Sequence, residues 1–200
     1  MQGAQLGNAT RGRPGEGPGH LRDGTLVIVR PVRPEDHAEL VEFVRGLGEE
    51  TLEDRFFGPV RPEMATAELE ECETPPDRLS LMVELASQPG RIIGQGEYVR
   101  DSPGAASAEV AFIVGEHFRE RGVASLLLER LAEAARLVGI LAFHASVQGV
   151  NTPMLDVFRG SGYLEVERWD DGDVSLSFSI VDRGGPASDK GQRASGAAKA

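Results

Sequence analysis

Residues 108–124, AEVAFIVGEHFRERGVA, constrain the fold of this chain more than any other stretch. An apolar strand is followed by a turn that carries two arginines and a glycine, and a helix begins near Val123. Gly122 lets the backbone come close to a ligand, because glycine has no Cβ. The first turn of the helix adds unpaired N–H groups and the positive end of a helix dipole. The junction predicts a cradle for a pyrophosphate, although a helix start without a ligand has the same local sequence.

Hydrophobic periodicity places further strands and helices along the chain. Strands are predicted at 25–32, 79–86, 91–99, 107–115, 141–147, 163–169 and 174–180, and helices at 34–46, 49–56, 62–73, 122–137 and 152–159. The last two strands form a hairpin through Asp171-Gly172. This order predicts an α+β (mixed α/β) fold with helices on both faces of one sheet.

The two ends of the chain differ in composition from the middle. Residues 1–23 and 183–200 are rich in Gly, Pro, Ser and Ala, so we expect both to be disordered tails around a folded unit at 24–182. The tails hold seven basic and three acidic residues and are therefore net positive. Because the whole chain has a net charge of −11, the folded unit carries −15. That balance excludes nucleic acid as the expected partner and suits a cationic one, although plain solubility also explains it.

Other features exclude further classes of function. Cys72 is the only cysteine and lies among glutamates, so no disulfide framework and no reactive thiol are expected. The histidines lack metal-ligand spacing with acidic or thiol companions, so no metal is expected. His144 is expected to be a core histidine rather than a residue of the cleft. No run is long and apolar enough to span a bilayer and no signal peptide is visible, which predicts a cytoplasmic protein without membrane contact.

Several short motifs together resemble those of the GNAT acetyltransferases, across residues 24–180. More narrowly, the chain resembles the bacterial protein lysine acetyltransferases of the Pat type. The residues that carry the resemblance are VRPVRPED at 29–36, Arg55-Phe56-Phe57, AEVAF at 108–112, RERGVA at 119–124, Asn151-x-x-Met154 and Gly160-x-Gly162-Tyr163. The resemblance implies the GNAT acyltransferase fold, in which a central, mostly antiparallel sheet is splayed at the cofactor strand.

The resemblance also implies an acetyl-CoA-dependent N-acetyltransferase, in which an amine attacks the thioester directly. A lysine with a pKa of about 10.4 must first lose a proton, which costs roughly 4.6 kcal/mol at pH 7. In Pat-type enzymes the glutamate that matches Glu109 acts as the general base. Without the resemblance, Glu109 would be a charge near solvent at a strand end.

Contacts to acetyl-CoA follow from the same resemblance. Main-chain groups of Ala111, Phe112, Ile113 and Val114 are expected to bind the pantetheine and polarise the thioester. Backbone N–H groups across Arg119, Glu120, Arg121, Gly122, Val123 and Ala124 are expected to bind the pyrophosphate, with a side chain of Arg119 or Arg121 adding charge. Asn151 either contacts the cofactor arm or caps the helix that follows. Phe158 stands where many GNAT enzymes have a tyrosine acid, so no general acid is identified.

Three functions remain open. The leading one is acetylation of lysine side chains in proteins, with the acids of 63–73 steering a basic surface toward Glu109. The second is acetylation of a small amine such as an amino sugar, polyamine or amino acid. The third is a non-catalytic acyl-CoA-binding module, against which an intact Glu109 argues. Relatives often carry a regulatory domain that this sequence does not show, so a regulatory partner supplied in trans is a further expectation.

Overall fold

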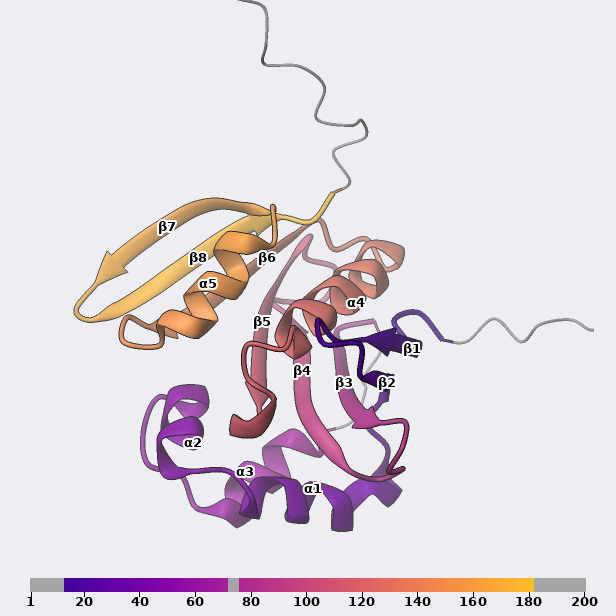
Figure 1. Cartoon of the computed structure of the whole chain (residues 1–200). Coiled ribbons are helices and arrows are strands. Elements are labelled where there is room, and N and C mark those ends of the chain that lie inside the picture. The colour runs from indigo at the N-terminus through magenta and orange to yellow at the C-terminus, as the bar shows by residue number, and fades with distance from the viewer. Residues whose placement is uncertain (1–12, 72–75, 182–200) are drawn as a thin grey trace, which may run out of the picture.

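The computed structural model describes residues 13–71 and 76–181, which form one eight-stranded sheet with helices packed against it (Figure 1). The strands are β1 (Gly17–His20), β2 (Leu26–Pro31), β3 (Arg78–Leu85), β4 (Ile92–Arg100), β5 (Ser107–Val114), β6 (Ala142–Gln148), β7 (Leu164–Asp170) and β8 (Asp173–Ser179). The α-helices are α1 (His37–Arg45), α2 (Glu49–Phe56), α3 (Pro62–Leu69), α4 (Val123–Leu137) and α5 (Thr152–Gly160), with short 3-10 turns η1 (Pro34–Asp36) and η2 (Glu116–Phe118).

The helices cover both faces of the sheet, as the sequence predicts. Helices α4 and α5 pack on one face over the larger core, which includes Leu131, Phe143 and Phe178. Helices α1 and α3 and the start of α2 cover the other face over a smaller core that includes Leu40 and Ile113. Alternate residues of β5 point into the two cores, as the period of a strand requires. Strand β5 is therefore held from both sides.

The strand order is β1-β2-β3-β4-β5-β6-β8-β7, and within the described sheet only β5 and β6 run parallel. Their pairing covers three positions and ends at Glu109 and His144, although both strands continue beyond that point. The rest of β5 stays bonded to β4. The sheet therefore opens between β5 and β6, which confirms the predicted fold of a mostly antiparallel sheet splayed at the cofactor strand.

The N-terminal part of the fold begins earlier than the sequence predicts. Strand β1 lies within 1–23, which we expected to be a disordered tail, and it pairs antiparallel with β2. Leu21 follows it and is buried in the larger core. The segment GPGH has almost no apolar side chain, so its pairing rests on backbone hydrogen bonds that composition does not reveal. The predicted tail at 183–200 and Cys72 lie outside the described residues.

The C-terminal hairpin forms as its turn sequence predicts. Asp171 and Gly172 connect β7 to β8, and both have positive φ angles, of 45° and 93°. Two consecutive left-handed residues are what a type I′ hairpin turn requires. The hairpin extends the sheet beyond β6, and β8 buries Val174, Leu176 and Phe178 on the face toward α5.

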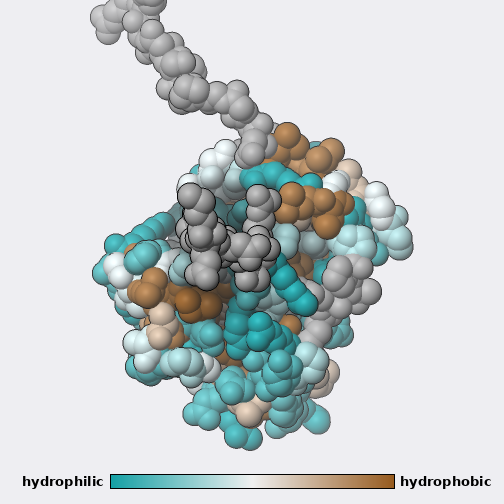
Figure 2. Space-filling view, turned by 90° about the vertical axis from the view of Figure 1, so that its right-hand side faces the viewer, coloured by the Kyte–Doolittle hydropathy of each residue, from teal (hydrophilic) through white to brown (hydrophobic). Residues whose placement is uncertain are grey.

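The surface is largely hydrophilic on the side that carries β1, where apolar residues form separate patches (Figure 2). None of the helices in the described part of the chain is long and apolar enough to cross a bilayer.

Candidate active site

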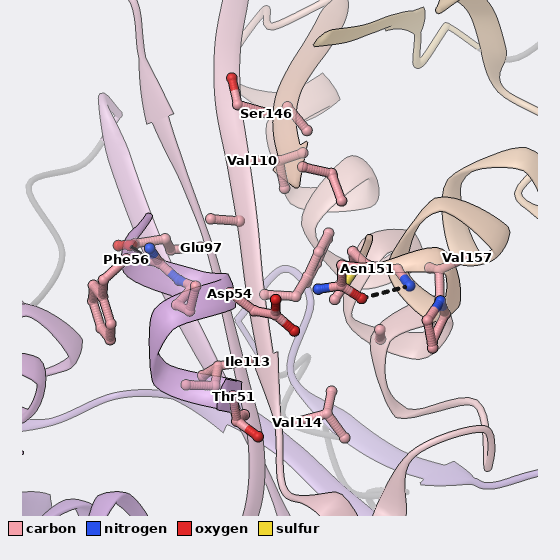
Figure 3. Close-up of a pocket in the computed structure, with 18 of the residues that line it drawn as sticks. Thr51, Asp54, Phe56, Glu97, Val110, Ile113, Val114, Ser146, Asn151 and Val157 are labelled. Carbon is pink, nitrogen blue, oxygen red and sulfur yellow. Dashed lines mark hydrogen bonds and ion pairs between the residues drawn. The ribbon is translucent and has the colours of Figure 1, made fainter. Parts of the chain in front are cut away.

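A cleft of about 1450 Å³ opens where β5 and β6 separate. Helix α2 and the loop after it form one wall, and the starts of α4 and α5 form the other (Figure 3). The described residues that line it include all but one of the predicted site residues: Glu109, Ala111, Phe112, Ile113, Val114, Arg119, Glu120, Gly122, Val123, Ala124 and Asn151. The structure thus brings these residues together around one space, and the exception is Arg121.

Glu109 lies at the closed end of the cleft. It is exposed, and it faces the same side of the sheet as Val99, its register partner on β4. Beyond it on β5, Ala111 and Ile113 continue along the same side, because side chains alternate along a strand. A molecule that entered between β5 and β6 would therefore meet a carboxylate where the strands join.

The predicted anion cradle has the backbone geometry that such a site needs. Glu120 and Gly122 have positive φ angles, of 60° and 93°, so the loop turns tightly just before α4. No described side chain caps the start of α4. The first N–H groups of a helix have no partner within the helix, and the dipole places positive potential there. The cradle therefore presents donors to the cleft at the end opposite Glu109.

The side chain of Arg121 points to the segment between β1 and β2 rather than into the cleft. Its Nε donates to Asp23 Oδ2 at 2.7 Å and its Nη2 donates to Thr25 Oγ1 at 3.0 Å. Hydrogen bonds from the Thr25 N–H and hydroxyl and from Arg121 lower the pKa of Asp23 to about 2. Arg121 therefore ties the loop to the segment between β1 and β2, and it is not among the described residues that line the cleft.

Arg22 is placed at the cradle instead, and sequence reasoning missed it. Its backbone N–H donates to the carbonyl of Arg121 at 2.9 Å, and its side chain lies beside Gly122, where a Cβ would be 3.2 Å from Arg22 Cγ. The side chain lines the cleft. No local signal marks Arg22, because it belongs to a segment of low complexity and meets the loop only through β1.

Arg119 connects the loop to α2 across the cleft. Its Nη2 donates to Thr51 Oγ1 at 2.6 Å, and Thr51 donates in turn to Glu116. Glu116 Oε1 also accepts from the Gly48 N–H at 2.7 Å. Burial alone would raise the pKa of Glu116, but these hydrogen bonds lower it overall. The chain of contacts fixes the distance between the two walls of the cleft.

Asn151 and Asp54 face each other across the cleft (Figure 3). Asn151 caps α5, since its Oδ1 accepts from the Met154 N–H at 3.2 Å, and it also lines the cleft. Asp54 comes from α2, and burial raises the pKa of its carboxyl, with Glu50 and Glu53 adding to the effect and Arg119 opposing it. Nothing in the acidic sequence EETLEDRF separates Asp54 from its solvated neighbours, so it was missed.

Glu97 is a buried carboxylate on the floor of the cleft. Its Oε1 accepts from Arg55 Nη2 at 2.6 Å, and its Oε2 accepts from Arg78 Nη2 at 2.6 Å and Nε at 3.0 Å. It pairs with Ala111 in register, so it lies on the same face as Glu109. Guanidinium groups therefore occupy both of its oxygens, and Glu97 joins α2 to β3 beneath the cleft.

The structure also places Phe158 and His144, two residues that the sequence analysis considered near the cleft. Phe158 is buried against Phe112 and Phe178, with ring centroids 5.9 Å and 5.6 Å away, so it supplies packing at the position of the missing tyrosine. His144 is not the core histidine that we expected. Its side chain is 42% exposed and its Nε2 lies 2.7 Å from Asp101 Oδ1.

Comparison with known proteins agrees with this geometry. The family described as "Acetyltransferase (GNAT) family" matches residues 48–163. The Acetyltransferase Pat of Mycolicibacterium smegmatis is 31% identical over 166 residues, covering 82% of this chain and 48% of the relative. The chain thus spans about half the length of that relative.

Solved structures show the same likeness. The GNAT domain of S. lividans PAT superimposes with a TM-score of 0.74 at 33% identity, over 82% of this chain and 97% of that domain. A cAMP-binding acyltransferase from Mycobacterium smegmatis gives a TM-score of 0.58 at 26% identity, over 82% of this chain and 47% of that protein.

Proposed function

This chain belongs to the GNAT acetyltransferase family, and from that premise we propose that it acetylates lysine side chains of proteins, with acetyl-CoA as the donor and Glu109 as the general base. The observation that carries the proposal is the cleft itself. It joins an anion cradle at one end to a carboxylate beside exposed apolar side chains at the other. The 31% identity to Acetyltransferase Pat supports a protein acceptor.

The described residues fit acetyl-CoA, which supplies an activated acetyl thioester when bound. The N–H groups at the start of α4, Arg22 and Arg119 would hold the pyrophosphate, because they combine unpaired donors with positive charge. From Ala111 to Val114 the edge of β5 no longer pairs with β6, so the alternate main-chain groups that face this edge would suit the pantetheine amides. A backbone N–H on this edge would also stabilise negative charge on the thioester oxygen.

The acceptor side of the cleft matches the form of a lysine side chain, which is an apolar stem that ends in an amine. Phe57, Met64 and Val99 line it and remain exposed by 46%, 63% and 39%. Glu68 and Glu71 lie on the same wall and add negative charge. The stem would lie along the apolar side chains and the ammonium group would be drawn toward Glu109. Glu109 would then take the proton that makes the amine unreactive.

The acceptor is tested by measuring CoA release from acetyl-CoA with matched peptides that carry one lysine, one ornithine or one arginine. We expect turnover with lysine and a kcat/KM about tenfold lower with ornithine, since one methylene against an apolar wall is worth about that factor. Arginine should give none. Free polyamines, amino sugars and amino acids form the second panel. Turnover with those amines and none with lysine peptides or proteins would contradict the proposed acceptor.

Arg22→Ala tests the cradle. We expect the KM for acetyl-CoA to rise by about five- to twentyfold with little change in kcat, because one charge-assisted contact to a phosphate is lost. The effect should shrink at high salt, since the side chain is exposed. Arg45→Ala, at the exposed end of α1, is the matched control. Equal KM values for the two variants would remove Arg22 from the donor site.

A further inference from the structure

Glu109 is paired with His144 at the point where β5 and β6 separate. This pair is the last of the three that join the strands. Side chains of paired residues project from the same face of a sheet, about 4.8 Å apart. Tyr98 and Phe143 meet on the opposite face, with ring centroids 6.0 Å apart, which confirms the alternation on β4 and β6. The side chains of Glu109 and His144 therefore leave neighbouring strands on the same face of the sheet, beside the closed end of the cleft.

The other side of the imidazole is held by Asp101. His144 Nε2 lies 2.7 Å from Asp101 Oδ1, and the hydroxyl of Ser107 donates to Asp101 Oδ2. Hydrogen bonds from Ser107 and His144 lower the pKa of Asp101, so it is a carboxylate at neutral pH. A carboxylate only accepts, so Nε2 carries the hydrogen and Nδ1 of a neutral ring is left to accept a proton. A carboxylate that fixes one nitrogen of a histidine prepares the other for acid–base work.

The surroundings of His144 favour proton transfer to solvent. It lines a second hollow, of about 310 Å³, on the face of β6, β7 and β8. The charged groups that face it are Asp101 after β4, Glu109 on β5 and Arg168 on β7. Its neighbours on β8 are serines. Two carboxylates and one guanidinium thus surround the ring.

We infer that His144, oriented by Asp101, accepts the proton that Glu109 removes from the acceptor amine and releases it to water. The inference rests on the proposed role of Glu109. The amine loses its proton to the Glu109 carboxylate, the proton passes to Nδ1 of His144, and the resulting imidazolium returns it to solvent. Glu109 is thereby a carboxylate again before the next turnover. His144 acts through Glu109 and does not itself contact the acceptor amine.

Proton transfer from a carboxylic acid to an imidazole is generally favourable. An ordinary imidazole holds a proton about two pKa units more tightly than an ordinary glutamate, which is about a hundredfold in the equilibrium. A carboxylate alone is a weak base for an ammonium group with a pKa of about 10.4. A neighbouring imidazole makes the removal less unfavourable, and its contribution should appear directly in the pH dependence of the rate.

His144→Gln tests the inference, because the glutamine amide can still donate to Asp101 but cannot take a proton. We expect kcat/KM to fall by about ten- to a hundredfold, which is less than the roughly 10²- to 10⁴-fold typical of a residue that itself takes the proton from the substrate. In this variant the decrease of kcat/KM on the acid side of the pH profile, in the range where an imidazole titrates, should disappear. Added imidazole should restore part of the rate. In Asp101→Asn kcat/KM should also fall, since the ring loses the carboxylate that orients it. His20→Gln, exposed on β1, is the matched control.

The melting temperature and acetyl-CoA affinity of each variant separate a chemical effect from a folding defect. Unchanged kcat/KM and an unchanged pH profile in His144→Gln would overturn the inference. If Glu109→Gln were inactive at the same time, the base assignment would still stand. If Glu109→Gln stayed active while His144→Gln lost activity, the proton could not pass through Glu109, and both ideas would fail.

Discussion

Glu109→Gln is expected to reduce kcat for acetyl transfer by about 10²- to 10⁴-fold, the range for loss of a general base. Glutamine keeps the size of the side chain and cannot take a proton, so the amine would stay protonated beside the donor. The affinity for acetyl-CoA should remain within about twofold, because the cradle lies at the other end of the cleft. CoA release and titration calorimetry measure the two quantities separately.

Asp54→Asn is the decisive companion variant. Asp54 lines the same cleft, and burial raises the pKa of its carboxyl, which is a property expected of a general base. It lies on α2, opposite Asn151 and away from the junction of β5 and β6 (Figure 3). We therefore expect a much smaller loss of kcat than in Glu109→Gln. The reverse order of losses would transfer the base role to Asp54.

The central part of the fold and site could be predicted from sequence because its signals are local. Within residues 108–124, the strand, the left-handed glycine and the helix start lie close together in the chain, so their spacing fixes the cradle. The hairpin turn at Asp171-Gly172 is local in the same sense. Glu109 is the only acid in its strand, but its proposed role came from the resemblance to Pat-type enzymes.

The residues that were missed owe their positions to contacts between distant segments. Arg22 reaches the cradle only because β1 pairs with β2, and Arg121 is drawn away by Asp23 from the same segment. His144 could not be placed until the register of β5 and β6 was known, because a shift by one residue reverses its face. Composition and periodicity carry no information about such pairings.

The partners of Glu97 could not be predicted from sequence either. Substitution of Glu97 has the largest expected effect on the free energy of unfolding. The sequence IIGQGEYVR marks an acid in an apolar strand but does not show its partners. Its side chain is 5% exposed and pairs with Arg55 and Arg78, which come from α2 and β3. In Glu97→Ala both guanidinium groups would lose their buried partner and keep only exposed ones, Glu68 for Arg55 and Glu71 for Arg78. Breaking a buried pair in this way costs about 3–5 kcal/mol.

Urea unfolding of Glu97→Ala against Glu42→Ala, an exposed acid on α1, measures this loss. The control should stay within about 0.5 kcal/mol of the parent protein. The triple variant Arg55→Met, Arg78→Met, Glu97→Leu should recover most of the stability, since apolar groups of similar volume can replace a buried ion pair. It should not recover full activity, because Arg55 and Arg78 line the acceptor side of the cleft. If Glu97→Ala were as stable as Glu42→Ala, the ion pairs of Glu97 with Arg55 and Arg78 would not stabilise the fold, and their role would lie in the acceptor site alone.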